Sequence, residues 1–182
     1  MHAPRDNADL AVHVRTIPDY PKPGILFRDI TTLLLDGKAF RETVDRLAEC
    51  VADRRATLVA GIEARGFVIA AALAYRLGIG TVLLRKPDKL PGARIGRDYA
   101  LEYGTDRIEM HSDACGPGSR VLLADDLIAT GGTASAGVDL LRMAGAEVVG
   151  ATFIIDLPDL GGADRLRADG VPVDALIAFP GH

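Results

Sequence analysis

The 182-residue sequence lacks several features on which whole classes of protein depend. It has no tryptophan and only 5% aromatic residues, which argues against an aromatic stacking platform for single-stranded nucleic acid. Its net charge is −4 and it has no dense run of lysine and arginine, so we expect no nonspecific binding to nucleic acid or membrane surfaces. Its two cysteines, Cys50 and Cys115, lie far apart and are too few for a disulfide scaffold.

Long hydrophobic runs are also missing. The longest wholly apolar stretch, residues 67–75, has nine residues, whereas a membrane-spanning helix needs about 20. The first ten residues, MHAPRDNADL, are polar and acidic where a signal peptide would be apolar. Because 48% of the residues are hydrophobic, the chain can still fill a sizeable core. We therefore expect a soluble, cytoplasmic protein with a single domain over residues 1–182.

The hydrophobic pattern alternates between strands and helices over most of the chain. Apolar residues recur at helical spacing over about residues 38–54, and we expect Cys50 to fill the core beside that helix. Strands are predicted at residues 58–62, 81–84, 120–124, 147–155 and 174–179, and helices at about 66–77 and 133–144. This alternation predicts an α/β fold, a central and mostly parallel sheet with helices on both faces. Such sheets bind ligands beyond the carboxyl ends of their strands.

Two segments interrupt this alternation. Residues 17–24 contain three prolines, so they cannot be helical and should form a rigid extended loop. Residues 87–103 contain proline, glycines and several charges before an alternating run of tyrosine and leucine. We predict a mobile loop there that leads into a strand and acts as a lid.

Residues 121–133, VLLADDLIATGGT, carry the most chemical information. A buried strand delivers two adjacent carboxylates, Asp125 and Asp126, to its carboxyl end, and the small residues 129–133 form a turn into a helix. Backbone N–H groups can approach an anion closely in such a turn, and the helix N-terminus favours negative charge. The pattern suits a phosphate at one end and sugar hydroxyls or a magnesium-bound group at the other. The simpler alternative, a tight turn with solvated acids, is disfavoured by the acidic pair at this spacing.

This motif resembles the phosphoribosyl-diphosphate-binding motif of the type I phosphoribosyltransferases, and other segments narrow the resemblance to the adenine phosphoribosyltransferases. In chain order these segments are DYPKPGILFRDI (19–30), EARGF (63–67), RK (85–86) with KLP (89–91), and LEYG (101–104). With the motif they cover about residues 15–182. The resemblance implies the type I phosphoribosyltransferase fold, with a small hood that carries the adenine segment (about 17–36) and a mobile lid (about 87–103).

The resemblance also implies the reaction. A pentosyltransferase of this family transfers 5-phosphoribose from phosphoribosyl diphosphate to N9 of adenine, gives AMP and pyrophosphate in purine salvage, and requires Mg²⁺. A homodimer is expected on the same ground. Breaking the bond between C1 and the diphosphate leaves an oxocarbenium-like centre, so the site must neutralise a departing polyanion and hold the ribose.

The resemblance assigns most of the candidate site to phosphoribosyl diphosphate. Asp125 and Asp126 would meet the ribose hydroxyls and the magnesium shell. The 5′-phosphate would bind to Ala129, Thr130, Gly131, Gly132 and Thr133, and the diphosphate to Arg65, Arg85, Lys86 and Lys89. Without the resemblance, Arg65 would be interpreted as a solvated arginine at the start of a helix.

Adenine would bind to Leu26, Phe27 and Arg28, with the Phe27 ring stacked on the base and neighbouring backbone groups reading its edge. On its own, an aromatic residue in the run Ile-Leu-Phe is more typical of a core. Glu102 matches the family's acid near N7 of the base, a candidate proton donor or acceptor; otherwise it would be a surface carboxylate.

Other residues bear on the choice of base. Hypoxanthine–guanine enzymes have an aspartate where this chain has Ala129, and they use a later lysine, whereas no lysine follows Lys89 here. Both absences favour a 6-amino purine. Asp156 stands where asparagine or glutamate is commoner, and near the base it would alter that pocket. The four histidines have no metal-ligand spacing, so we expect surface or packing roles for them.

Three other functions stay open. A regulator could keep this fold and sense phosphoribosyl diphosphate without turnover, but the acidic pI and the roughly sixteen residues before the family-like segment argue against a DNA-binding domain. A phosphoribosyltransferase for xanthine is disfavoured by Phe27, Arg28 and Glu102. A doubly wound protein that binds some other phosphate is the third, because a fold alone does not determine function.

Overall fold

The structure is a computed structural model that describes residues 7–100 and 104–181. Its elements in chain order are α1 (Ala8–Ala11), β1 (Arg15–Pro18), β2 (Leu26–Asp29), α2 (Thr31–Leu35), α3 (Gly37–Cys50), η1 (Ala52–Arg54), β3 (Leu58–Ile62), α4 (Arg65–Leu77), β4 (Gly80–Leu84), β5 (Arg94–Ala100), β6 (Thr105–His111), β7 (Arg120–Ile128), α5 (Gly132–Met143), β8 (Glu147–Asp156), η2 (Pro158–Leu160), α6 (Gly162–Ala168) and β9 (Val173–Ala178). None of the helices in these two ranges is long and apolar enough to cross a membrane.

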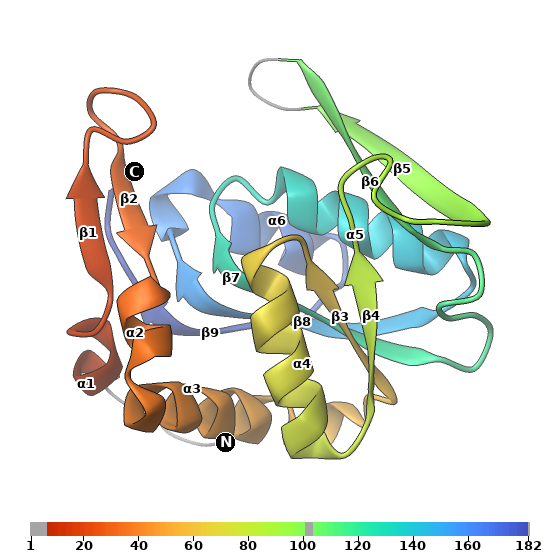
Figure 1. Ribbon diagram of the computed structural model, residues 1–182, viewed down its shortest axis with the longest axis horizontal. Helices are drawn as coiled ribbons and strands as arrows, with labels where there is room; N and C mark the ends of the chain where they lie inside the picture. Colours follow the sequence, from red (N-terminus) through yellow and green to blue (C-terminus); the bar gives the residue numbers. More distant parts are fainter. Residues whose placement is uncertain (1–6, 101–103, 182) are drawn as a thin grey trace.

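Five strands form the central sheet, in the order β4-β3-β7-β8-β9 (Figure 1). All four pairings in this sheet are parallel. Its middle strands are almost continuously apolar and buried, as expected for a sheet covered on both faces. The predicted parallel sheet is confirmed.

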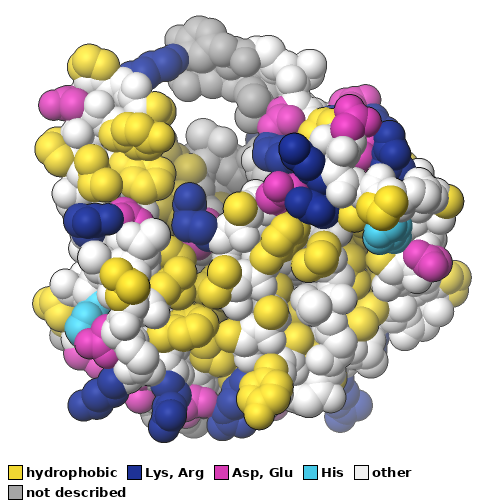
Figure 2. Space-filling model, viewed as in Figure 1, with side chains coloured by type: hydrophobic (Ala, Val, Ile, Leu, Met, Phe, Trp, Pro, Cys, Tyr) yellow, Lys and Arg dark blue, Asp and Glu magenta, His cyan; other side chains and the backbone are white. Residues whose placement is uncertain are grey.

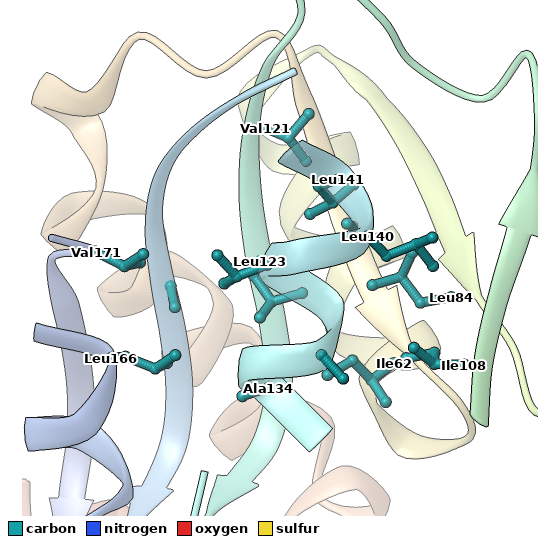
Figure 3. Close-up of a cluster of buried hydrophobic side chains, with 14 of the residues drawn as sticks. Ile62, Leu84, Ile108, Val121, Leu123, Ala134, Leu140, Leu141, Leu166 and Val171 are labelled. Atoms are coloured by element: carbon teal, nitrogen blue, oxygen red, sulfur yellow. The ribbon is translucent and has the colours of Figure 1, made fainter. Parts of the chain in front are cut away.

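Helices cover both faces of this sheet. The first four helices pack on one face, where Leu47 of α3 and Leu73 of α4 lie against Leu122 of β7. Helices α5 and α6 pack on the other face, and β6 contributes Ile108 to the same core (Figure 3). The predicted α/β fold is therefore confirmed, and each face has its own hydrophobic core.

Two antiparallel ribbons lie outside the sheet. In the first, β1 pairs with β2, so Ile17 and Pro18 are strand residues and only the rest of the predicted loop at 17–24 is irregular. In the second, β5 pairs with β6, so the predicted lid segment 87–103 contains the whole of the regular strand β5. Residues 101–103 of that segment lie outside the described residues. The second ribbon packs against α5, through Ile95 and Ile108 among others.

Other expectations need correction. Strand β7 continues to Ile128, so Asp125 and Asp126 lie within the strand and not beyond its end. Cys50 is exposed, so its predicted core position is wrong: the buried stripe of α3 runs through Leu47 and Ala48, and Cys50 falls beside it. Short elements such as β2, α2 and α6 were not predicted, because a few residues cannot display a hydrophobic period.

Candidate active site

A cavity of about 610 Å³ lies at the carboxyl ends of β3, β7 and β8, where ligands of parallel sheets bind. In Figure 2 the surface is hollowed between the β1–β2 ribbon at the upper left and the β5–β6 ribbon at the upper right. The lining consists of residues 25–28, 62–65, 86, 125–134, 157 and 160. Segments from six parts of the sequence therefore meet around one space.

The acidic pair forms the floor of this cavity. Asp125 Oδ1 accepts a hydrogen bond from the backbone N–H of Asp126 at 2.9 Å. A Cβ atom at Gly66 would lie 2.7 Å from the same oxygen, so the start of α4 packs directly on the carboxylate and only glycine fits there. Burial, together with the charge of Asp126, raises the pKa of Asp125 well above its usual range. The two carboxylates thus lie side by side in the cavity, with Asp126 buried and Asp125 half-buried.

Arg65 links the acidic pair to the β1–β2 ribbon. It begins α4, its Nε donates a hydrogen bond to Asp126 Oδ2, and its guanidinium carbon lies 5.5 Å from the centroid of the Phe27 ring. Burial opposes the charge, but the bond to Asp126 still raises the pKa of Arg65. Arg65 is therefore a paired cation on the cavity wall, with a side chain that is still 45% exposed.

The turn before α5 is held by close backbone packing. Gly131 has a φ of +79° and precedes the first residue of the helix. The N–H of Gly162 donates to the carbonyl oxygen of Ala129 at 3.0 Å, and a Cβ at Gly162 would lie only 2.2 Å from that oxygen. The first N–H groups of an α-helix lack intrahelical acceptors, so this turn presents donors to an anion. Sequence reasoning missed Gly162, and the pair Gly161-Gly162 was its only signal.

Strand β2 forms the apolar end of the cavity. Leu26, Phe27 and Arg28 all line it, and the Phe27 ring meets Tyr20 edge-on with centroids 5.3 Å apart. Phe27 belongs to neither core, so the interpretation from its apolar neighbours alone is wrong. The guanidinium of Arg28 lies 4.4 Å from the centroid of the Phe179 ring. The Arg28 side chain thus fastens the ribbon to the C-terminal segment.

Of the other three cations predicted to bind the diphosphate, the structure places only one in the cavity wall. Lys86 lines the cavity, but Arg85 and Lys89 are not among the residues that form its wall. Arg85 Nε instead donates to Glu63 Oε2 at 3.2 Å, and Arg85 Nη1 donates to the carbonyl oxygen of Lys89 at 3.1 Å. Glu63, which sequence reasoning missed, also accepts from the backbone N–H of Lys86 at 2.9 Å. These bonds outweigh burial and lower the pKa of Glu63.

The remaining candidates lie elsewhere. Glu102, the predicted catalytic acid, lies outside the described residues. Asp156 ends β8 but does not line the cavity, and burial raises its pKa. Within residues 7–100 and 104–181, no three histidine, cysteine or acidic residues are grouped so that they could hold a metal ion by themselves.

Comparisons with known proteins agree with this architecture. Residues 31–174 match the family model of the phosphoribosyl transferase domain. An adenine phosphoribosyltransferase of Bradyrhizobium sp. strain BTAi1 is 63% identical over 174 residues, which cover 96% of this chain and 97% of that protein.

Solved structures are similar over the same extent. The adenine phosphoribosyltransferase of Thermoanaerobacter pseudethanolicus has a TM-score of 0.91 and 45% identity, and the match covers 94% of this chain and 99% of that one. The enzyme of Giardia lamblia complexed with 9-deazaadenine has a TM-score of 0.89 and 32% identity, with 96% and 98% covered. Because sequence and structure agree over nearly the whole length, the chain belongs to the adenine phosphoribosyltransferase family.

Proposed function

We propose that this protein transfers 5-phosphoribose from phosphoribosyl diphosphate to N9 of adenine and releases AMP and pyrophosphate. The observation that carries the proposal is the cavity itself, which joins an anion-binding turn, an acidic pair and an aromatic ring in one space. The turn suits the phosphate of the product, the acidic pair suits the ribose hydroxyls, and the aromatic ring suits the base. Membership of the family supports the same reaction.

The phosphoribosyl diphosphate would lie across the carboxyl ends of β3 and β7. Its 5′-phosphate would accept hydrogen bonds from the turn at residues 129–133, and its 2′- and 3′-hydroxyls would meet Asp125 and Asp126. Arg65 and Lys86 would lie beside the diphosphate as it leaves. As the bond between C1 and the diphosphate oxygen breaks and the bond to N9 forms, positive charge develops on the sugar ring, and the acidic pair would lie beside that charge.

Magnesium suits this donor set. Mg²⁺ in enzymes keeps several waters and binds through one or two carboxylates plus substrate phosphates, so a three-acid cluster is not needed. Asp125 and Asp126 line the cavity next to the expected diphosphate and would hold the ion. Held by these residues, the ion would supply positive charge that neutralises the leaving diphosphate.

Adenine would lie at the apolar end, against Phe27 and between Leu26 and Leu160. When the bond to N9 forms, adenine must lose its one imidazole-ring proton, and from the resemblance we assign Glu102, near N7, as the group that accepts this proton from N7 and returns it in the reverse reaction. Replacing Glu102 by Gln should lower kcat far more than it changes KM, because the interaction matters in the transition state. An unchanged kcat would remove Glu102 from the mechanism.

We further infer that the chain forms one domain, with a hood near residues 17–36 and a lid near 87–103, and that it functions in the cytoplasm. We also infer that two copies form a homodimer. Large apolar side chains stand exposed on α4 and on the edge strand β4, among them Val68, Tyr75 and Leu83. Figure 2 shows hydrophobic side chains gathered over these two elements. A patch of this kind favours association with a second copy.

A base panel tests the reaction. Purified protein is mixed with Mg²⁺, phosphoribosyl diphosphate and, separately, adenine, hypoxanthine, guanine or xanthine, and nucleotide formation is followed. AMP from adenine, with little product from the three 6-oxo purines, is the expected result. Binding of phosphoribosyl diphosphate without product from any base would instead identify a sensor. Reaction with xanthine would identify a phosphoribosyltransferase for that base.

A further inference from the structure

Lys86 reaches the cavity from the segment after β4, but its ammonium is held by the β5–β6 ribbon. Its Nζ donates a hydrogen bond to Asp106 Oδ2 of β6 and another to the Tyr99 hydroxyl of β5. The distance from Nζ to the Tyr99 hydroxyl oxygen is 3.0 Å. Tyr99 and Asp106 face each other in the register of the ribbon. Neither residue lines the cavity, so both contact Lys86 without forming part of the cavity wall.

The Tyr99 hydroxyl joins three parts of the fold. It donates to Asp106 Oδ2 at 2.9 Å and accepts from Lys86 Nζ and from Thr133 Oγ1, the latter at 3.4 Å. A phenol has one hydrogen to donate and lone pairs that accept, so these contacts use its whole capacity. Since Thr133 lies in the first turn of α5, the same hydroxyl connects Lys86 to the anion-binding turn.

These contacts restrict a side chain that is otherwise flexible. Lysine loses much rotamer freedom when it is fixed, and a ligand gains affinity if the protein has already fixed it. An ammonium group has three N–H donors, and two of them are used by Tyr99 and Asp106. One donor is left for an oxygen in the cavity.

The cavity also offers Lys86 unproductive partners. The carboxylates of Glu63, Asp125 and Asp126 line the same wall. A lysine released from the ribbon can pair with one of them, and it would then neutralise an acid that the ribose or Mg²⁺ needs. The bond to Asp106 keeps the ammonium away from these acids.

We propose that Asp106 and Tyr99 are positioning residues that hold Lys86 for the diphosphate group of phosphoribosyl diphosphate. They set the affinity for that substrate without touching it, and they do not affect adenine. The inference rests on the proposed function for the identity of the substrate.

The test compares Asp106→Ala with the wild type. The KM for phosphoribosyl diphosphate should rise about three- to tenfold because the lysine is no longer fixed, while the KM for adenine stays within about twofold. Asp106→Asn should restore part of the loss, since its amide oxygen can still accept from Lys86. Tyr99→Phe, which keeps the ring and removes the hydroxyl, should shift the same KM in the same direction.

A double-mutant cycle tests whether Asp106 acts through Lys86. In a Lys86→Met background, Asp106→Ala should leave the affinity for phosphoribosyl diphosphate unchanged, because the group that it positions is gone. Asp98→Ala is the matched control, since Asp98 pairs with Arg107 on the same ribbon, at 2.9 Å, and does not contact Lys86. It should leave both KM values unchanged.

Titration calorimetry with phosphoribosyl diphosphate and Mg²⁺ gives the same comparison without turnover. If wild-type protein binds this ligand but makes no AMP, the proposed reaction fails while the role of Asp106 stays measurable. Unchanged affinity in Asp106→Ala would overturn the inference, and tighter binding would as well, since it would make Asp106 a competitor of the diphosphate. Melting temperatures of the variants, and the milder Asp106→Asn, separate an effect on the site from an effect on folding.

Discussion

The contact between Gly66 and Asp125 shows how closely single residues determine this site. The helix that carries Arg65 begins so near the acidic strand that a methyl group at Gly66 would meet Asp125 Oδ1 at 2.7 Å and the carbonyl oxygen of Ala124 at 3.0 Å. Both obstacles belong to the central strand β7, which cannot move without disturbing its neighbours. The position of the Asp125 carboxylate and the position at which α4 begins therefore depend on each other.

Replacing Gly66 by Ala should consequently lower the free energy of unfolding by about 1–3 kcal/mol, as overpacking of a close contact does. It should also raise the KM for phosphoribosyl diphosphate, because Asp125 must shift. Urea denaturation and steady-state kinetics measure the two effects.

Gly37→Ala is the control, since nothing lies within 4 Å of a Cβ at that position, in the first turn of α3. It should be neutral or slightly stabilising. Equal behaviour of the two variants would contradict the packing argument.

At the scale of elements, the β1–β2 ribbon depends on a buried carboxylate at its end. Asp29 accepts a hydrogen bond from the Arg15 side chain. It also accepts from the backbone N–H of Thr31 at 2.9 Å and from the Thr31 hydroxyl at 2.8 Å. Burial opposes its ionisation, but these bonds lower the pKa of Asp29 from 3.8 to about 2. Because the folded-state pKa lies below the unfolded value, the ionised carboxylate stabilises the fold above about pH 4, and this contribution is lost as the pH falls toward about 2.

Asp29→Asn should therefore lower the free energy of unfolding by about 1–3 kcal/mol at pH 7, and the difference from wild type should shrink at pH 3. Urea denaturation at a series of pH values measures both. An Asp53→Asn variant, at an exposed position in η1, should differ little from wild type at every pH. A pH-independent difference for Asp29→Asn would contradict the role of its charge.

The elements also show which parts of the site a sequence can predict. Residues 121–133 predict an acidic strand end and an anion-binding turn, because strand, acids and turn are contiguous. Tyr99 and Asp106 belong to the surroundings of the site only through contacts across the fold, and their own neighbours in sequence give no sign of it. Gly162 has only the adjacent Gly161 as a sign. Phe27 is ambiguous for a related reason, since an apolar ring can fill a core or line a cavity, and only the position of β2 decides.

At the scale of the whole molecule, the exposed apolar side chains of α4 and β4 bear on assembly. Tyr75 is 90% exposed, and with the exposed Val68 and Leu83 it forms part of an apolar surface that a second copy can cover. A Tyr75→Arg variant should weaken the proposed dimer, because it places a charge on that surface. Sedimentation velocity over a range of concentrations measures the association.

Met143→Arg provides the comparison, since Met143 is a large apolar residue at the end of α5, 59% exposed, and belongs to neither α4 nor β4. It should leave the association unchanged. A wild-type protein that stays monomeric at all concentrations would contradict the proposed dimer.

The order of strands in the sheet also determines when the fold can be completed during synthesis. Strand β3 pairs on one side with β4, which follows soon after it, but on the other side with β7, which begins only at Arg120 after the whole β5–β6 ribbon. A chain that stops before Arg120 leaves one edge of an apolar strand with open backbone donors and acceptors, a surface that pairs readily with other chains. Ribosome stalling or proteolysis within the ribbon would therefore release aggregation-prone fragments. A chain that ends just after β7 would only move the open edge from β3 to β7, because β8 covers that edge in the complete sheet.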